Sequence, residues 1–490
     1  MGKENYFQFI SEDTHIEILV AEYLDNNPRY IGTEELCMQF NISMFTTRKI
    51  IKMLELDIEN YDRPGYAIDV TTRGVRLIVP LEDDLKNFFI YVTCQSPNVQ
   101  ILISIFFGRF KSITQYSLEN HMSEATVRRA INVIRKVLKK LDIEITNKTF
   151  SFKGDEKQIR MFLLLFFWRL NRGLSWPFAS VSEKSMELLV NQLCRNLNIS
   201  NLSTIKRKRL MYFFAIIVIR INDAKFIKTD KVLQYTKNLE KIEVSIKASG
   251  FIRDLSKSEL YFIYTMFKGF CMFSDMNEEI DYEIEHSLPA GMATQYVLEK
   301  LNDEFPEFIE NNRVRARDFL FATHTFANEL HNFSSDMNGY FYFKFMDKYF
   351  PNISERLVMF FKQARKDTKL DLFDEHTFLL IHYNMLLAQL PTSLSIEKSV
   401  KVYVETALPS VLEDLLIEQV HSYFKIRYNI QMLNGSKKIN REDVDMLLVT
   451  IPLEEYKSEY PNAQIIAVNR DLKPVDYEKI ESVLSKLLDN

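Results

Sequence analysis

Basic side chains are concentrated between residues 123 and 141, and their type and spacing suit contacts with nucleic acid. They are Arg128, Arg129, Arg135, Lys136 and Lys139. Arginine and lysine neutralise phosphate groups, and arginine also pairs with the edge of guanine in a DNA major groove. Apolar residues recur between them at helical spacing, and they are Val127, Ala130, Ile131, Ile134, Val137, Leu138 and Leu141. The segment is therefore predicted to be a helix with one buried face and one cationic face.

A helix that reads DNA needs a second helix to place it in the groove, and the neighbouring residues supply one. Residues 117–122 predict a short helix, and Ser123 is well placed to cap the helix that follows. The pattern then predicts a short hairpin and a further helix. The segment fits a helix-turn-helix, whose candidates for DNA contact are Ser123, Thr126, Arg128, Arg129, Arg135 and Lys136. The alternative is an ordinary solvated helix face, because many surface helices carry lysine and arginine.

The same pattern occurs near the N-terminus. Residues 33–40 predict a short helix, residues 41–43 a turn, and residues 44–54 a second helix. The apolar side chains predicted to be buried in that second helix are Phe45, Ile50, Ile51 and Leu54. The candidates for DNA contact in this unit are Ser43, Thr46, Thr47, Arg48, Lys49 and Lys52.

A wing is predicted after the first of these units. Residues 57–61 and 66–70 are expected to pair as strands around Asp62-Arg63-Pro64-Gly65, because proline presets one backbone angle of a turn and glycine relieves another. Two basic helices, each preceded by a short helix and followed by a hairpin, are much less probable by chance than one. The repetition favours DNA binding over a solvated face.

Length and composition indicate a large folded chain. Its 490 residues are 47% hydrophobic, which is enough for several domains with buried cores. The net charge is −4, so any phosphate-binding surface must be local. The longest apolar runs, residues 161–168 and 210–219, are too short for a bilayer, which takes about 20 residues. The acidic N-terminus has no signal peptide, and we therefore expect a cytoplasmic protein.

The sequence offers no candidate catalytic centre. Cys37, Cys94, Cys194 and Cys271 lie far apart and are expected to be buried free thiols. We find no metal-ligand spacing and no motif for a cofactor, so the predictions are no metal, no cofactor and no catalytic residue. Walker, GxSxG, HExxH and dinucleotide-binding patterns are absent from the sequence. We expect a protein that is not an enzyme.

The rest of the chain predicts two further kinds of structure. Residues 162–395 are patterned almost wholly as helices, which indicates two helical bundles in tandem. The last part predicts a small α/β domain with a parallel sheet. Its expected strands are residues 400–404, 428–433, 444–451 and 464–468, and its expected helices are residues 408–424 and 477–488.

A family resemblance starts at the junction between the second helix-turn-helix and the first bundle. Gly154-Asp155-Glu156 followed by Ile159-Arg160 is similar to the G-D-E-x-x-I-R sequence that leads into the first phosphotransferase-regulation domain (PRD) of bacterial sugar regulators. The order of the predicted parts resembles the Mga/AtxA type of virulence regulator. The resemblance implies a mainly α, multidomain fold. Its five domains would be a winged helix-turn-helix (residues 1–80), a second helix-turn-helix with a hairpin (81–160), two PRD-like bundles (161–284 and 285–395) and an EIIB-like α/β domain (396–490).

PRDs accept phosphate on histidines, one seven residues before an arginine and another seven after a glutamate. In the first bundle those positions hold Phe213 and Met266. In the second bundle those positions hold His324 and His382. His324 lies seven residues before His331, which stands where the family has an arginine, and His382 lies seven residues after Glu375. The resemblance implies that a phosphocarrier protein of the sugar phosphotransferase system modifies His324 or His382. The alternative is that both are ordinary packed histidines.

The EIIB-like domain lacks the features that phosphotransfer needs. Such domains carry phosphate on a cysteine just after the first strand, where this chain has Glu405-Thr406-Ala407-Leu408-Pro409. There is no cysteine, the acid opposes phosphate, and Pro409 has no amide hydrogen to donate. We predict that this domain mediates self-association instead.

The combined prediction is a DNA-binding transcriptional regulator, an activator by resemblance, that binds double-stranded promoter DNA. It is expected to form a homodimer through its C-terminal half and not to bind membranes. Two alternatives stay open: a phosphotransferase-system enzyme component, and an RNA-binding antiterminator, since such proteins also carry tandem PRDs. The helix-turn-helix patterns at the N-terminus favour duplex DNA over RNA.

Overall fold

The computed structural model describes residues 9–81, 85–199, 202–229, 231, 236–252, 255–273, 275–304, 306–335, 351–387, 398–425, 427–433 and 440–488, without the side chains of residues 302–315 and 351. The chain divides into two compact units. The N-terminal unit comprises Met1–Gly291, His324–Phe333 and Met337–Tyr340, and the C-terminal unit comprises the remainder. The predicted five-domain division is finer and stays a prediction, and its last boundary lies outside the described residues.

The N-terminal unit begins with a winged helix-turn-helix. Its elements are α1 (Glu12–Asn26), α2 (Thr33–Phe40), α3 (Met44–Tyr61), β1 (Ala67–Thr71) and β2 (Gly74–Ile78). The predicted position of the wing along the chain is therefore wrong. Residues 57–61 are helical because Ile58 continues the buried face that Leu54 lines one turn earlier, and the helix ends only at Asp62, which has a left-handed backbone. The hairpin forms later, with β1 antiparallel to β2 around Thr72 and Arg73.

The second helix-turn-helix follows directly. Its elements are α4 (Lys86–Cys94), α5 (Pro97–Phe106), α6 (Ile113–Glu119), α7 (Glu124–Lys139), β3 (Glu144–Ile145) and β4 (Phe152–Lys153). The first helix of the motif starts four residues earlier than predicted, because Ser112 caps it by accepting a hydrogen bond from the amide of Gln115. The predicted cap by Ser123 is confirmed, and so is the short antiparallel hairpin.

A helical bundle completes the N-terminal unit. Its helices are α8 (Glu156–Asn171), α9 (Glu183–Asn196), α10 (Thr204–Asn222), α11 (Lys237–Ser249), α12 (Lys257–Gly269) and α13 (Asn277–Glu285). The two longest apolar runs of the sequence are the buried cores of α8 and α10. Among the described residues, no single helix has both the length and the apolar character to span a membrane; only the bent pair of α4 and α5 meets that test, by length and composition.

The junction motif builds a buried ionic network between three of these helices. Asp155 caps α8 by accepting a hydrogen bond from the amide of Lys157 at 2.9 Å. Arg160 on α8 pairs with Glu259 on α12 at 2.5 and 2.9 Å, and Glu156 bridges Arg160 and Arg220 of α10 at 3.1 and 2.6 Å. All four members of the network are almost fully buried, so the resemblance rests on residues that hold the bundle together.

More helices follow the bundle. They are α14 (Pro289–Glu304), α15 (Pro306–Glu329), α17 (Pro351–Thr368), a 3-10 turn η2 (Asp371–Asp374) and α18 (His376–Leu387). Each of the three longer helices in this group begins at a proline, as expected from a residue whose fixed φ suits the first helical position. The described parts agree with the predicted helical character of this region.

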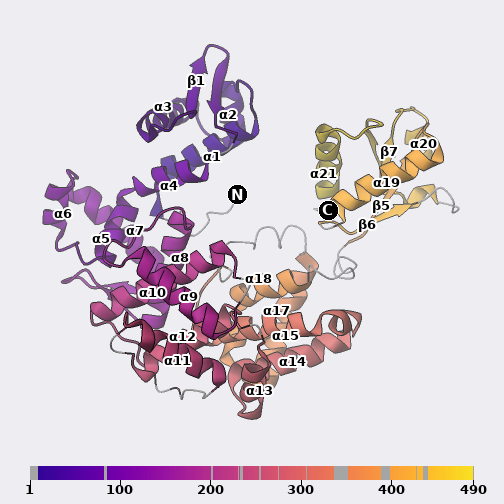
Figure 1. Ribbon diagram of the computed structural model, residues 1–490. Helices are drawn as coiled ribbons and strands as arrows, with labels where there is room; N and C mark the ends of the chain where they lie inside the picture. The colour runs from indigo at the N-terminus through magenta and orange to yellow at the C-terminus, as the bar shows by residue number, and fades with distance from the viewer. Residues whose placement is uncertain are drawn as a thin grey trace. The chain divides into compact units, whose positions relative to one another are not determined.

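The C-terminal part is the predicted α/β domain with a parallel sheet. Its elements are β5 (Val400–Glu405), α19 (Ser410–Phe424), β6 (Ile430–Leu433), η4 (Arg441–Asp443), β7 (Met446–Val449), α20 (Tyr456–Glu459), β8 (Gln464–Ala467) and α21 (Pro474–Leu488). The strand order is β6-β5-β7-β8, and all neighbours are parallel. Helices α19 and α21 pack on one face of the sheet and α20 on the other (Figure 1).

The cysteines are not all buried as predicted. Cys194 is buried, Cys37 and Cys94 are partly buried, and Cys271 is exposed. Cys271 lies two residues beyond the end of α12 and has a left-handed backbone at φ 52°, so it is no longer on the buried face of that helix. None of the four forms a disulfide.

The winged unit contains a buried acid that makes its stability depend on pH. Burial raises the pKa of Glu17 on α1 from 4.5 to about 9, and like-charge repulsion from Asp57 adds to the shift. As pH rises the unfolded chain releases this proton first, so the winged unit loses stability progressively between about pH 4.5 and 9, by up to roughly 1.4 kcal/mol per pH unit. Glu17→Gln is expected to flatten this dependence.

Hydrogen exchange of the α1 and α3 amides from pH 5 to 8, corrected for the intrinsic exchange rate, measures the effect. Glu22→Gln, an exposed change on the same helix, serves as the control and should keep the wild-type slope. An unchanged slope in Glu17→Gln would contradict the assignment.

Candidate nucleic-acid interface

The two helix-turn-helix units repeat the same backbone geometry with an offset of 80 residues, as from Ser43 to Ser123. The turn of each unit contains one residue with a left-handed backbone, Asn41 at φ 51° and His121 at φ 52°. In each unit the serine hydroxyl then accepts a hydrogen bond 3.1 Å long from the amide three residues further on. We call α3 and α7 the recognition helices, because they are the second helices of the two motifs.

The repeat extends beyond the recognition helices. Asp62 and Asp142, at φ 46° and 55°, turn the chain after α3 and α7, and Gly74 and Gly154, at φ 127° and 149°, lie at the hairpins. A side chain at Gly154 would approach the carbonyl oxygen of Asp142 to 2.9 Å, which explains the glycine of the junction motif. Equivalent positions of the two units can therefore be compared directly.

The outward face of α7 is cationic. Arg128, Arg129, Lys136 and Lys139 are exposed. Arg128 forms an ion pair with Glu124 at 3.1 Å, but both side chains are exposed, so the pair costs little to break. This face can therefore exchange its local partners for phosphate groups.

Arg135 has a different position from the other candidates on α7. Its side chain is half-buried, and its Nη2 donates a hydrogen bond of 2.7 Å to the side-chain oxygen of Asn147 in the hairpin turn. Arg135 therefore fixes the hairpin against the recognition helix.

The outward face of α3 is also basic but partly neutralised. Arg48, Lys49 and Lys52 are exposed. Lys49 pairs with Asp13 at 2.5 Å and Lys52 with Glu55 at 3.5 Å. The second unit thus presents more uncompensated positive charge on its recognition helix than the first.

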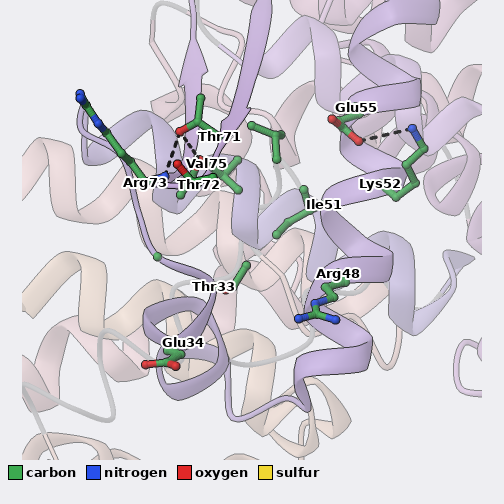
Figure 2. Close-up of a pocket in the computed structure, with 13 residues that line it drawn as sticks. Thr33, Glu34, Arg48, Ile51, Lys52, Glu55, Thr71, Thr72, Arg73 and Val75 are labelled. Carbon is green, nitrogen blue, oxygen red and sulfur yellow. Dashed lines mark hydrogen bonds and ion pairs between the residues drawn. The ribbon is translucent and has the colours of Figure 1, made fainter.

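A surface pocket of about 500 Å³ lies between α3 and its hairpin. Figure 2 shows Arg48 and Lys52 on α3 and Arg73 on the hairpin turn among the residues that line it, with the Arg73 side chain directed outward and Lys52 directed toward Glu55. The hydroxyl of Thr71 accepts a hydrogen bond from the amide of Arg73 at 3.2 Å and so shapes the turn. The sequence pattern does not predict Arg73 as a site residue, because it puts the turn of the wing at residues 62–65. The signal for the true turn is the sequence Thr72-Arg73-Gly74.

Two predictions about α3 are wrong. Thr47 is buried, and its hydroxyl donates a hydrogen bond to the carbonyl of Ser43 at 3.1 Å, so it packs inside the motif as Val127 does in the second unit. Phe45, predicted to be buried, is 81% exposed. Ile50, Ile51 and Leu54 are buried as predicted, and both errors concern only the start of the buried face, which lies at Thr47, two residues after Phe45.

Four hydroxyl candidates form part of the helix starts. The hydroxyls of Ser43 and Thr46 lie 2.9 Å apart, as do those of Ser123 and Thr126. Because the serine oxygens already serve as caps, these residues position the recognition helices, and the exposed basic residues remain the main candidates for phosphate contacts.

Both candidate histidines are buried. His324 is fully buried, and burial lowers its pKa from 6.5 to about 3. His382 is buried as well, and its Nδ1 donates a hydrogen bond of 2.8 Å to the carbonyl oxygen of Phe378, because a carbonyl only accepts. A phosphate donor cannot reach either ring in this conformation.

Comparison with known proteins agrees with the geometry. The Mga helix-turn-helix domain family matches residues 82–167, which contain α7 and its hairpin. The anthrax toxin expression trans-acting positive regulator of Bacillus anthracis is 24% identical over 212 residues, 43% of each chain. A protein named as a trans-acting regulator in Streptococcus pneumoniae serotype 4 is 24% identical over 224 residues, 45% of this chain and 44% of that protein.

These matches span less than half the length of either relative. The domain match covers the more basic of the two recognition helices, α7. Residues 82–167 therefore match an Mga helix-turn-helix domain, and the chain is similar, over less than half of its length, to two proteins named as trans-acting regulators, one of them the anthrax toxin regulator.

Proposed function

We propose that the protein is a cytoplasmic transcriptional regulator of the virulence type that binds duplex promoter DNA through α7 and α3. The observation that carries this proposal is the repeat itself: two helix-turn-helix units with the same turn, the same serine cap and exposed arginines at equivalent positions, Arg48 and Arg128. Activation is the favoured sign of regulation, because one relative is named as a positive regulator.

Equilibrium binding of the full chain to duplex DNA across a salt series tests the proposal. The logarithm of the binding constant should fall linearly with the logarithm of salt concentration, with a slope of about −0.9 for each phosphate neutralised. Absence of binding at low salt would overturn the proposal. Preferential binding to single-stranded or hairpin RNA would favour the antiterminator alternative instead.

Self-association through the α/β domain is the second part of the proposal. Exposed apolar side chains gather where the parallel strands end: Val411, Leu412 and Leu415 on α19, and Ile451 and Leu453 after β7. A hydrogen bond of 3.4 Å from the Ala407 amide to the Thr450 hydroxyl brings the two loops of this edge together. An apolar surface of this kind is typical of an interface between protein chains.

The double variant Val411→Asp/Leu415→Asp is expected to dissociate the dimer at least about 100-fold more readily, because each carboxylate would have to be buried without a partner. Sedimentation equilibrium measures the change. Leu188→Asp, at an exposed leucine of α9, should leave the assembly intact. A dimer of wild-type affinity in the double variant would exclude this surface.

Phosphorylation at His324 or His382 is the third part, and burial adds a condition to it. The bundle must open locally before a phosphocarrier protein can reach either ring, and nearly two added charges would then oppose reclosure. The residues that follow α15, the helix that carries His324, contact the segment after α7 and the start of α8: Asn332 donates to the Asp142 carboxylate at 2.7 Å, and the His331 amide donates to Gln158 at 3.0 Å. Local opening of the bundle around His324 would therefore disturb contacts at the end of α7, the second recognition helix.

Phosphorylation assays with purified phosphotransferase components test this part. Label should appear on the wild type and disappear in His324→Ala/His382→Ala. Label that persists in the double variant, or that never appears, would reject the two histidines as acceptors.

A further inference from the structure

Phe45 occupies a position on α3 where packing does not explain it. It is the second residue of the helix and 81% exposed. Arg48, Lys49 and Lys52 follow it at helical spacing and are exposed as well, so the four side chains share one outward face. The phenylalanine ring thus stands at the N-terminal end of a basic stripe.

The second unit shows that the fold does not need an aromatic residue there. The position equivalent to Phe45 is Ala125, which is exposed too and starts the same kind of capped helix. The buried positions of α3 and α7 coincide over the first three turns, so the exchange of alanine for phenylalanine changes only the outward surface. Phe45 therefore adds a large apolar group to the outward face of α3 that the outward face of α7 lacks, and its basic neighbours decide what that group can contact.

The chemistry of the surrounding face selects the partner. The start of a recognition helix is the part that lies nearest the base edges in a major groove. The apolar group that a base presents there is the 5-methyl of thymine, and phenylalanine is among the side chains that contact it. The neighbouring arginine and lysines suit the phosphates on either side and oppose an apolar protein surface, since their charges would be buried with the ring.

We propose that Phe45 reads the 5-methyl group of a thymine in the major groove and gives the first helix-turn-helix a preference that the second lacks. This inference rests on the proposed function. Ala125 leaves a smaller apolar surface at the same place, so the two units would select different bases while using the same docking geometry.

A cycle of protein and DNA substitutions tests the proposal. A duplex is selected from a random pool with the full-length wild type, and each thymine in the protected region is replaced singly by deoxyuridine, which removes only the methyl group. Wild type is expected to lose about fourfold in affinity at one or two thymines, the factor for one methyl group removed from water. Phe45→Ala should bind the thymine duplex about fourfold more weakly and show no further loss with deoxyuridine at those positions.

Leu56→Ala is the matched control, because Leu56 is another exposed apolar residue of α3, three turns further along. It should keep the full difference between thymine and deoxyuridine. The inference would be overturned if deoxyuridine lowered the DNA affinity of wild type and Phe45→Ala equally, or lowered neither. Salt-dependent binding of the wild type would still support the proposed function in that case. Failure of the wild type to bind any duplex would remove both, and an undiminished DNA affinity in Phe45→Ala would point to a protein partner.

Discussion

The double variant Arg128→Ala/Arg129→Ala should bind duplex DNA about 30-fold more weakly than the wild type at physiological ionic strength. Both side chains lie on the exposed face at the start of α7, and loss of each contact costs roughly 1 kcal/mol or more. If both arginines neutralise phosphates, the slope of the salt dependence should also fall in magnitude by about two. Fluorescence anisotropy across a salt series measures affinity and slope together.

The control must remove the same charge elsewhere in the N-terminal unit. Lys184→Ala/Lys237→Ala does so on α9 and α11, where both lysines are exposed. This control should bind with nearly wild-type affinity, because only charges within about a Debye length of the DNA contribute appreciably. Equal losses in the two double variants would mean that net charge, and not the α7 face, determines binding.

A comparison with Arg48→Ala/Lys52→Ala ranks the two units. A smaller loss is expected in this variant, because Lys52 lies almost one turn further along α3 than Arg129 does along α7, and so further from the helix start that lies nearest the bases. A larger loss would show that the first unit dominates the affinity.

Replacing Glu259 with glutamine should destabilise the first helical bundle by about 3–5 kcal/mol. The carboxylate is fully buried and accepts hydrogen bonds from both terminal nitrogens of Arg160 and, at 2.8 Å, from the amide of Ile227. The neutral amide would leave Arg160 and Arg220 to share one anion, Glu156, in the interior. Because a chain with several domains does not unfold in one step, hydrogen exchange of the α8, α10 and α12 amides is the appropriate measurement.

Two further variants identify the cause of the destabilisation by Glu259→Gln. Glu278→Gln changes an exposed acid on α13 and should have no effect beyond a few tenths of a kcal/mol. Arg160→Met/Glu259→Leu removes both members of the pair, and it should be more stable than Glu259→Gln because no buried charge is left unpaired. If the double variant were less stable than the single one, hydrogen bonding rather than charge balance would be the main contribution of the Arg160–Glu259 pair to the stability of the bundle.

Local sequence patterns were sufficient for the elements that carry the candidate interface. The cap at Ser123 was predictable because its hydroxyl bonds to an amide three residues away, which is an interaction within one turn of chain. The parallel sheet of the last domain was predictable for a related reason, since apolar strands alternating with amphipathic helices leave few other arrangements.

The errors have a common physical origin. The sequence predicts wing strands at residues 57–61 and 66–70 because Asp62-Arg63-Pro64-Gly65 forms a good turn, but a turn sequence does not fix where strands begin. Burial of Ile58 against the core of the winged unit extended α3 by two turns instead. The apolar pattern predicts a buried Phe45, but exposed apolar residues are common, and only the neighbours of a side chain in space decide its role.

The sequence by itself determined the types and order of the elements, the basic faces of α3 and α7, and the mismatch with phosphotransfer in the last domain. These features depend on residues close together in the chain. Only the tertiary structure decided that Arg160 meets Glu259, 99 positions away, that His324 and His382 are interior, and that Phe45 faces outward. A helical pattern specifies which face of a helix is buried, but the element that covers that face, and the partners it supplies, follow from packing across the whole fold.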